Sequence, residues 1–150
     1  MAEKEGAPPP KWLKLVNRGM VFAQRALGVT MGPVHVLTVP GRTSGEPRST
    51  PMSIVALNGA RYVVAGYAKS DWVRNARAAK AGTLSVGKKS QDVDIVEVGA
   101  DEARPVLREF PVQVPTGVGF MKRGGVVTDG TPEEFEALAG KIVVFRFDPR

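Results

Sequence analysis

One short stretch, residues 41–51, gathers the side chains and backbone types that bind anions. Gly41 and Gly45 allow backbone conformations that other residues resist, and exposed N–H groups in such turns form concave anion sites. Arg42 and Arg48 can add bidentate, charge-assisted hydrogen bonds to a phosphate or a carboxylate. An ordinary polar turn could have the same composition, and the spacing is neither that of a P-loop nor that of GxGxxG. Hydroxyl donors and a closing proline complete the stretch: Thr43, Ser44, Ser49, Thr50 and Pro51.

A second candidate group occupies residues 66–75, where a strand is expected to pass into a helix. The N-terminus of a helix offers free N–H groups and the positive end of its dipole, and Lys69 stands just before it. Tyr67 and Trp72 could flank a planar ring, whereas Trp72 could equally belong to the core. Arg74 and Arg77 could be plain surface charges.

The residue inventory excludes several kinds of catalytic site. The chain has no cysteine and a single histidine, which excludes disulfides, thiolate catalysis and a histidine-rich metal site. His35 lies inside an apolar strand pattern, so we interpret it as a structural residue rather than a general base. No GxSxG elbow is present. The carboxylates of Asp92, Asp94 and Glu97 alternate along one strand and are interpreted as solvated, and no metal site is predicted.

Positive charge is concentrated in one third of the chain. The net charge is +6, yet residues 42–89 carry nine Lys and Arg against two Asp and Glu, a balance of +7. Such a local field attracts anions, although a solvated basic face is the simpler explanation. The basic stretch has few interleaved aromatic residues and no recognised nucleic-acid module, so nucleic acid is not an expected partner.

Hydrophobic periodicity predicts about six strands and four helices. Asn58-Gly59 is the strongest hairpin signal, and Ser70 is expected to cap a helix. Residues 1–10 are expected to be a flexible lead-in and residues 11–150 a single domain. The amphipathic helix 11–27 is expected to cover the sheet or to make peripheral membrane contact. The predicted strands are residues 34–39, 52–57, 60–65, 83–86, 91–98 and 142–147, and the predicted helices are residues 11–27, 70–79, 101–110 and 132–139.

These elements favour a mainly β (α+β) fold. Hairpins imply antiparallel pairing, and regular βαβ alternation is missing, so an antiparallel barrel with outer helices fits best. No stretch approaches the roughly 20 apolar residues that cross a bilayer, and a cytoplasmic, possibly membrane-associated location is expected. The glycine-rich residues 116–125 are expected to form a long loop, either a lid whose Phe120 and Met121 line a substrate pocket or a disordered connector.

At residues 37–51 the sequence resembles the signature loop of the deazaflavin-dependent nitroreductase family. The carrying residues are Leu-Thr-Val-Pro-Gly-Arg-Thr-Ser-Gly at 37–45 and Arg-Ser-Thr-Pro at 48–51. Asn58-Gly59, residues 62–65, residues 72–78 and the Lys11-Trp12 start extend the resemblance over roughly residues 11–98. The chain departs from the family at Thr43, where lysine is common, and it has no clear match to the family's C-terminal tyrosines.

The resemblance implies an FMN-binding-like split β-barrel that binds reduced coenzyme F420, a deazaflavin with a phosphodiester and an oligoglutamate tail. By position, Arg42, Ser44, Gly45 and Arg48 would grip the phosphate and tail, together with Thr43 and Ser49. Thr50 and Pro51 would lie near the ring. Trp72 and Asn75 would hold the helix against the site. The ring or its side chain would be contacted by Gly66, Tyr67, Ala68 and Lys69.

The implied activity is an F420H2-dependent oxidoreductase that passes a hydride to an unsaturated or carbonyl-conjugated small molecule. Tyr67, Ser70 or water are the candidate proton donors. Two alternatives stay open: an FMN-binding reductase of the same fold and a non-catalytic lipid- or fatty-acid-binding protein. A homodimer is possible, and reduction of nitro compounds is left undecided.

Overall fold

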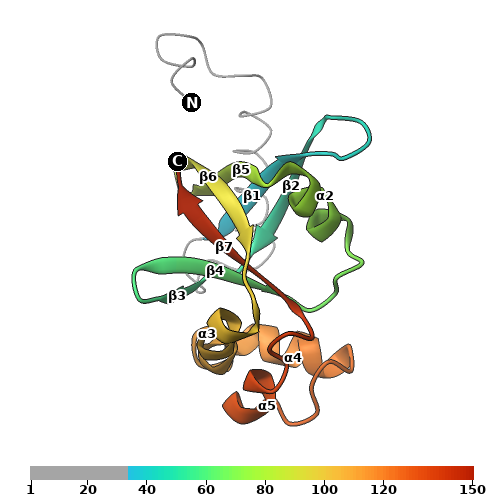
Figure 1. Ribbon diagram of the computed structural model, residues 1–150, viewed down its shortest axis with the longest axis vertical. Coiled ribbons are helices and arrows are strands. Elements are labelled where there is room, and N and C mark those ends of the chain that lie inside the picture. The colour runs from blue at the N-terminus through green and yellow to red at the C-terminus, as the bar shows by residue number, and fades with distance from the viewer. Residues whose placement is uncertain (1–33) are drawn as a thin grey trace.

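The computed structural model of the chain describes residues 34–150. The predicted lead-in 1–10 and the predicted helix 11–27, with its expected sheet or membrane contact, lie outside the described residues. The described part is built on one antiparallel sheet in the order β2-β1-β5-β6-β7-β4-β3 (Figure 1). Its strands are β1 His35–Pro40, β2 Pro47–Met52, β3 Val55–Leu57, β4 Ala60–Ala65, β5 Ala81–Val86, β6 Lys89–Glu97 and β7 Val143–Pro149.

The sheet is curled into a half-barrel because its two edges are joined by a very short connection. β2 and β3 lie at opposite edges of the sheet, yet only Ser53 and Ile54 separate them along the chain. Three Cα steps from Met52 to Val55 span at most about 11 Å. The two edges must therefore approach each other at this end, and the sheet opens at the other.

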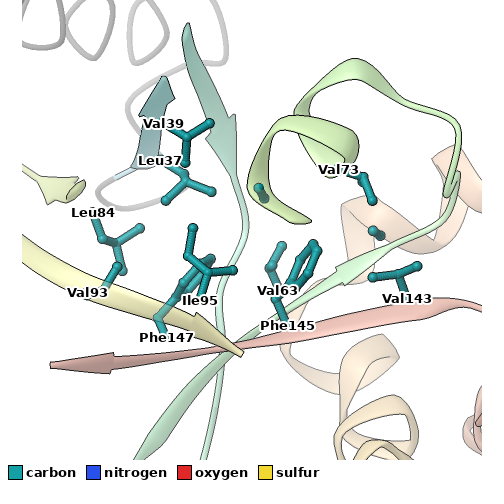
Figure 2. Packing of buried hydrophobic residues seen from close by; sticks show 12 residues of the cluster. Leu37, Val39, Val63, Val73, Leu84, Val93, Ile95, Val143, Phe145 and Phe147 are labelled. Atoms are coloured by element: carbon teal, nitrogen blue, oxygen red, sulfur yellow. The ribbon is translucent and has the colours of Figure 1, made fainter. Parts of the chain in front are cut away.

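Alternate residues of the same strand face two different cores, as the two-residue period of a strand requires. On β4, Val63 packs in one cluster of buried residues and Val64 in the other. On β7, Phe145 packs in the first cluster and Val144 in the second. Figure 2 shows the first cluster, which fills the concave side of the sheet.

Helix α2, Asp71–Ala79, closes the first cluster with the buried side chains of Val73 and Ala76. The second cluster lies between the other side of the sheet and three helices (Figure 1). These are α3 Ala100–Gln113, α4 Pro115–Arg123 and α5 Pro132–Glu136. The Phe110 and Phe135 rings of α3 and α5 meet with centroids 5.1 Å apart.

A network of charged side chains ties α3 to the barrel. The Arg146 guanidinium on β7 donates to both carboxylate oxygens of Glu102 on α3 and pairs with Asp148. The Tyr62 hydroxyl on β4 donates to the same Glu102 carboxylate at 2.9 Å. The hydrogen bonds from Arg146 lower the pKa of the Glu102 and Asp148 carboxyls below their ordinary values.

Most predicted elements are confirmed within the described residues. Asn58 and Gly59 both have positive φ, 53° and 78°, as a two-residue hairpin turn requires. The second hairpin turns at Gly87, whose φ is 58°. Helix α2 begins after Ser70, although that side chain makes no capping hydrogen bond. The predicted helices 101–110 and 132–139 correspond to the longer α3 and the shorter α5.

Within residues 34–150 there are seven strands rather than about six, because the stretch around residue 50 forms the end of one strand and the start of another. The predicted loop 41–51 is a turn only as far as Glu46, since residues 47–52 pair with β1 as strand β2. The predicted strand 52–57 is broken at Ser53, so Met52 ends β2 and Val55 starts β3. Proline at both Pro47 and Pro51 is tolerated because β2 is an edge strand.

The loop predicted over residues 116–125 is wrong, because residues 115–123 form helix α4. Pro115 stands at the first helical position, where its missing N–H costs nothing. Gly117 lies so close to α3 that an added Cβ would stand 2.6 Å from the Phe110 ring. Tertiary packing thus overrides the poor helix propensity of glycine. Within residues 34–150, no helix is long and apolar enough to span a bilayer.

Candidate functional site

A polar cavity of about 660 Å³ lies between the β1–β2 turn, strand β2 and the start of helix α2. Most of the predicted anion-binding residues meet here, because the β1–β2 turn is tied to the start of α2 through Arg42, Asp71 and Asn75. The lining residues are Gly41, Arg42, Thr43, Ser44, Arg48, Ser49, Thr50, Asp71, Trp72 and Asn75.

Arg42 is anchored in this cavity by residues of α2. Its backbone N–H donates to the Asn75 Oδ1 at 3.1 Å, and its Nη1 donates to the same oxygen at 2.8 Å. Its Nη2 pairs with the Asp71 carboxylate at 3.3 Å. The Asn75 side chain is buried, with 6% of the residue exposed. Asn75 therefore ties both the backbone of the turn and the Arg42 guanidinium to helix α2.

The backbone of the turn differs from the expected anion nest, since most of its N–H groups are used inside the protein. The Gly41 amide donates to Glu46, the Gly45 amide donates to Gly41, and the Glu46 amide donates to the Ser44 hydroxyl. The Arg42 amide is taken by Asn75. An anion in this cavity must therefore be bound mainly by side chains.

The Arg48 guanidinium is the most available of the cavity's cations. Its only hydrogen bond within the described residues is a long one, 3.5 Å, from Nη2 to the Ser44 hydroxyl. The Ser49 hydroxyl, in contrast, is already shared with Thr38 at 2.8 Å. Arg48 can thus turn its fork of donors toward a ligand at little cost.

A second, mainly apolar cavity of about 310 Å³ adjoins the polar one. The two cavities share Thr50 and Trp72 as lining residues, so they lie side by side, and together they are called the groove. Trp72 is half-buried, and its ring centroid lies 5.9 Å from that of Phe145, so it contacts the core as well as lining the groove. The other lining residues are Pro51, Met52, Ser53, Val63, Val64, Ala65, Gly66, Tyr67, Ser70, Phe110, Val114, Gly117, Phe120 and Met121.

The link from β4 to α2 brings some of its predicted site residues to the groove and leaves others outside. Gly66, Tyr67 and Ser70 line the apolar cavity, whereas the exposed Ala68 and Lys69 line neither part of the groove. Gly45 also lies outside the groove and lines a separate cavity of about 370 Å³ beside Gly82.

Helix α4 provides a wall of the apolar cavity that sequence reasoning recovered only in part. Phe120 and Met121 were expected to line a pocket, and they do. Phe110, Val114 and Gly117 were missed. Their spacing of three to four residues leading up to Met121 is the signal of a helical face that would have revealed them.

The basic segment does not act as one surface. Of its nine cations, only Arg42 and Arg48 line the polar cavity. The Arg77 guanidinium pairs with Glu97, and the Arg61 guanidinium donates to Gln91 at 2.6 Å. The positive charge of this segment is therefore divided between the polar cavity and other surfaces.

The residues interpreted as structural or solvated have identifiable partners. His35 starts β1 half-buried, and burial, aided by the Arg61 charge, lowers the pKa of its imidazole. Asp94 pairs with Arg150, and Asp92 accepts a hydrogen bond from Thr83 at 3.2 Å. None of the three lines the groove.

Three solved structures share this fold. An F420-H2 dependent reductase is 21% identical, over 78% of this chain and 95% of its own, with a TM-score of 0.57. A structure described as a domain-swapped dimer is 20% identical, over 94% and 100%, with a TM-score of 0.57. A nimc/nima family protein from Clostridium acetobutylicum is 18% identical, over 86% and 81%, with a TM-score of 0.52. At these identities the likeness shows the fold alone.

The comparison with family sequence profiles shows the family as well as the fold. No curated protein matches the chain. The sequence profile of the F420H2-dependent quinone reductases matches residues 16–124, which include the turn, β2, α2 and α4 that build the groove. The chain belongs to the F420H2-dependent quinone reductase family, a family of oxidoreductases.

Proposed function

We propose that this protein binds reduced coenzyme F420 in the groove and uses it to reduce an unsaturated or carbonyl-conjugated small molecule. The observation that carries the proposal is that a polar and an apolar cavity adjoin at Thr50 and Trp72. A ligand with an anionic tail and a flat ring needs such a division. Membership of the family supports the same cofactor and gives no support to FMN.

The polar cavity fits the phosphodiester and the glutamate carboxylates of this cofactor. Arg42 is held in place by Asn75 and Asp71. Within the described residues, only one N–H group of the Arg48 guanidinium makes a hydrogen bond, so the others can bind a ligand. Guanidinium groups bind such oxyanions through paired hydrogen bonds. We assign the remaining contacts of the tail to the hydroxyls of Thr43, Ser44, Ser49 and Thr50.

The apolar cavity fits the ring and the acceptor. When bound, the reduced deazaflavin supplies the hydride. Pro51, Gly66, Tyr67 and Trp72 are placed to orient the ring, while Met121 and its neighbours on α4 keep water from the acceptor.

Ser70 and Tyr67 are the residues that we assign to proton delivery. Ser70 lines the apolar cavity at the start of α2, and its side chain makes no capping hydrogen bond there. Tyr67 lies beside it and accepts a hydrogen bond from the Ser70 amide through its carbonyl at 3.2 Å. Within the described residues neither side-chain hydroxyl makes a hydrogen bond, although the Tyr67 phenol packs against Gly124, so Ser70 is the donor that we assign first.

Titration of the purified protein with reduced coenzyme F420 tests the cofactor assignment. We expect saturable binding, followed by changes in the cofactor's fluorescence and absorbance, and oxidation of the cofactor when a quinone is added. An unchanged signal at high micromolar protein would show that the groove does not bind this cofactor.

The assembly state is a separate proposal. One similar structure is described as a domain-swapped dimer, and we propose that this chain also forms a homodimer. Light scattering coupled to gel filtration, over a hundredfold range of concentration, measures the mass directly. A monomer's mass throughout would rule the dimer out.

A further inference from the structure

Tyr67 and Phe120 form an exposed aromatic pair at the apolar cavity. Both line the cavity, yet Tyr67 is 42% exposed and Phe120 is 57% exposed. Their ring centroids are 6.2 Å apart with planes at 84°, an edge-to-face contact. Tyr67 comes from the link between β4 and α2, and Phe120 comes from α4. The pair therefore joins two walls of the groove that are distant in sequence.

Gly124 makes the space that the Tyr67 ring occupies. A Cβ at Gly124 would collide with the Tyr67 hydroxyl and would stand 2.9 Å from the Tyr67 Cζ. The φ of Gly124 is −80°, a value open to any residue, so backbone strain does not explain the glycine. The end of α4 thus forms a notch for the phenol.

The Met121 side chain of α4 packs against Gly66 of the opposite wall. A Cβ at Gly66 would stand 3.5 Å from the Met121 Cε, an ordinary contact distance. Within the described residues, no side-chain hydrogen bond holds the Tyr67 hydroxyl. The notch and the Phe120 edge are therefore the contacts that hold the ring at the cavity.

We propose that Tyr67 and Phe120 act as a latch that determines which acceptors enter the apolar cavity. This inference rests on the proposed function, because it concerns the acceptor side of the same groove. The closed latch narrows the opening between the link and α4 and admits a small flat acceptor. An acceptor with a bulky substituent must displace the edge contact, so it is disfavoured.

The test compares two acceptors, unsubstituted 1,4-benzoquinone and a decyl-substituted benzoquinone, through the ratio of their kcat/KM values. Any change in cofactor binding common to both reactions cancels in this ratio. Phe120→Ala removes one half of the latch, and Gly124→Ala fills the notch and expels the Tyr67 ring. Gly119→Ala is the matched control, since its Cβ would meet only the Arg123 Nη1, at 3.5 Å.

We expect Phe120→Ala and Gly124→Ala each to shift the ratio about three- to tenfold toward the decyl-substituted acceptor. The double variant should shift it no further, because either change alone opens the latch. Gly119→Ala should leave the ratio unchanged. Ratios within twofold of the original in both single variants, or fully additive effects, would overturn the latch. Failure of the original protein to bind reduced F420 would instead refute the proposed function.

Discussion

The small, buried side chain of Asn75 holds the exposed guanidinium of Arg42 in position. Its Oδ1 accepts from both the backbone and the guanidinium of Arg42, across 33 positions of the sequence. The carbonyl oxygen of an amide has two lone pairs, so one residue satisfies both donors. The position of Arg42 in the polar cavity thus depends on Asn75, whose role implied by the family resemblance was to hold the helix against the site.

Replacing Asn75 tests this role. Asn75→Ala should lower the free energy of unfolding by about 1–3 kcal/mol, because the Arg42 amide loses its acceptor. Asn75→Asp should retain most of the stability, since a carboxylate accepts the same two hydrogen bonds. Urea denaturation measures both. An equal loss in the two variants would show that acceptance of these two hydrogen bonds is not what Asn75 contributes to stability.

Arg48 is the cation that we expect to contribute most to binding of the cofactor's anionic part. Arg48→Ala should raise the Kd for reduced F420 about tenfold. Added salt should weaken cofactor binding by the original protein more than cofactor binding by the variant. Arg61→Ala is the matched control, because it removes the same charge from the basic segment outside the groove. Equal effects of the two substitutions would indicate a general field rather than a contact.

Helix α4 shows how two glycines in one element can differ in their physical role. Gly117 faces the Phe110 ring, and a Cβ there would approach Phe110 to 2.6 Å and Val114 to 3.0 Å. Gly119 has only the flexible end of Arg123 near it. The first glycine permits the close approach of α4 to α3, and the second costs helix stability without a packing benefit.

Alanine substitutions in α4 should therefore have opposite signs. Gly117→Ala should destabilise the protein by about 1–3 kcal/mol through overpacking. Gly119→Ala should stabilise it by about 0.5–1 kcal/mol through helix propensity. Thermal melting followed by circular dichroism measures both shifts. A lower melting temperature for Gly119→Ala would contradict the distinction.

Across the whole molecule, the charged network around Arg146 links the barrel to the helices that wall the groove. Glu102 lies on α3, while Arg146, Asp148 and Tyr62 lie on barrel strands. Both carboxyls have a lowered pKa, chiefly through hydrogen bonds from Arg146. A carboxyl whose folded-state pKa is lowered contributes stability above its unfolded pKa and loses it as the pH falls through the folded pKa.

Stability should accordingly fall on acidification below about pH 4.5, near the pKa of an unfolded glutamate. In Glu102→Gln this decline should be shallower, because one linked proton is removed, and the stability at pH 7 should be lower. Urea midpoints between pH 3 and 7 measure the effect. Asp101→Asn is the control, since that carboxylate is fully exposed in a surface pair with Arg104. An identical pH profile for Glu102→Gln and the original would refute the linkage.

Local signals explain which parts of the fold could be predicted from the sequence. The Asn58-Gly59 turn and the start of α2 depend on interactions within a few residues, which the sequence displays directly. The site residues around Arg42 and Trp72 were found from the signature loop and from the helix that follows. Strand β2 was assigned to a loop because its prolines and hydroxyls lack an apolar alternation, and only pairing with β1 makes it a strand.

The sequence by itself determined the antiparallel strands, the candidate anion-binding side chains at residues 42–48 and membership of the family. The tertiary structure decided which cations share a cavity, that α4 is a helix, and that Tyr67 meets Phe120 above a notch at Gly124. The physical reason is the separation along the chain over which each kind of interaction acts. Turn and strand preferences act between neighbours, whereas these contacts exist only after the sheet has curled and brought α2 and α4 to the same groove.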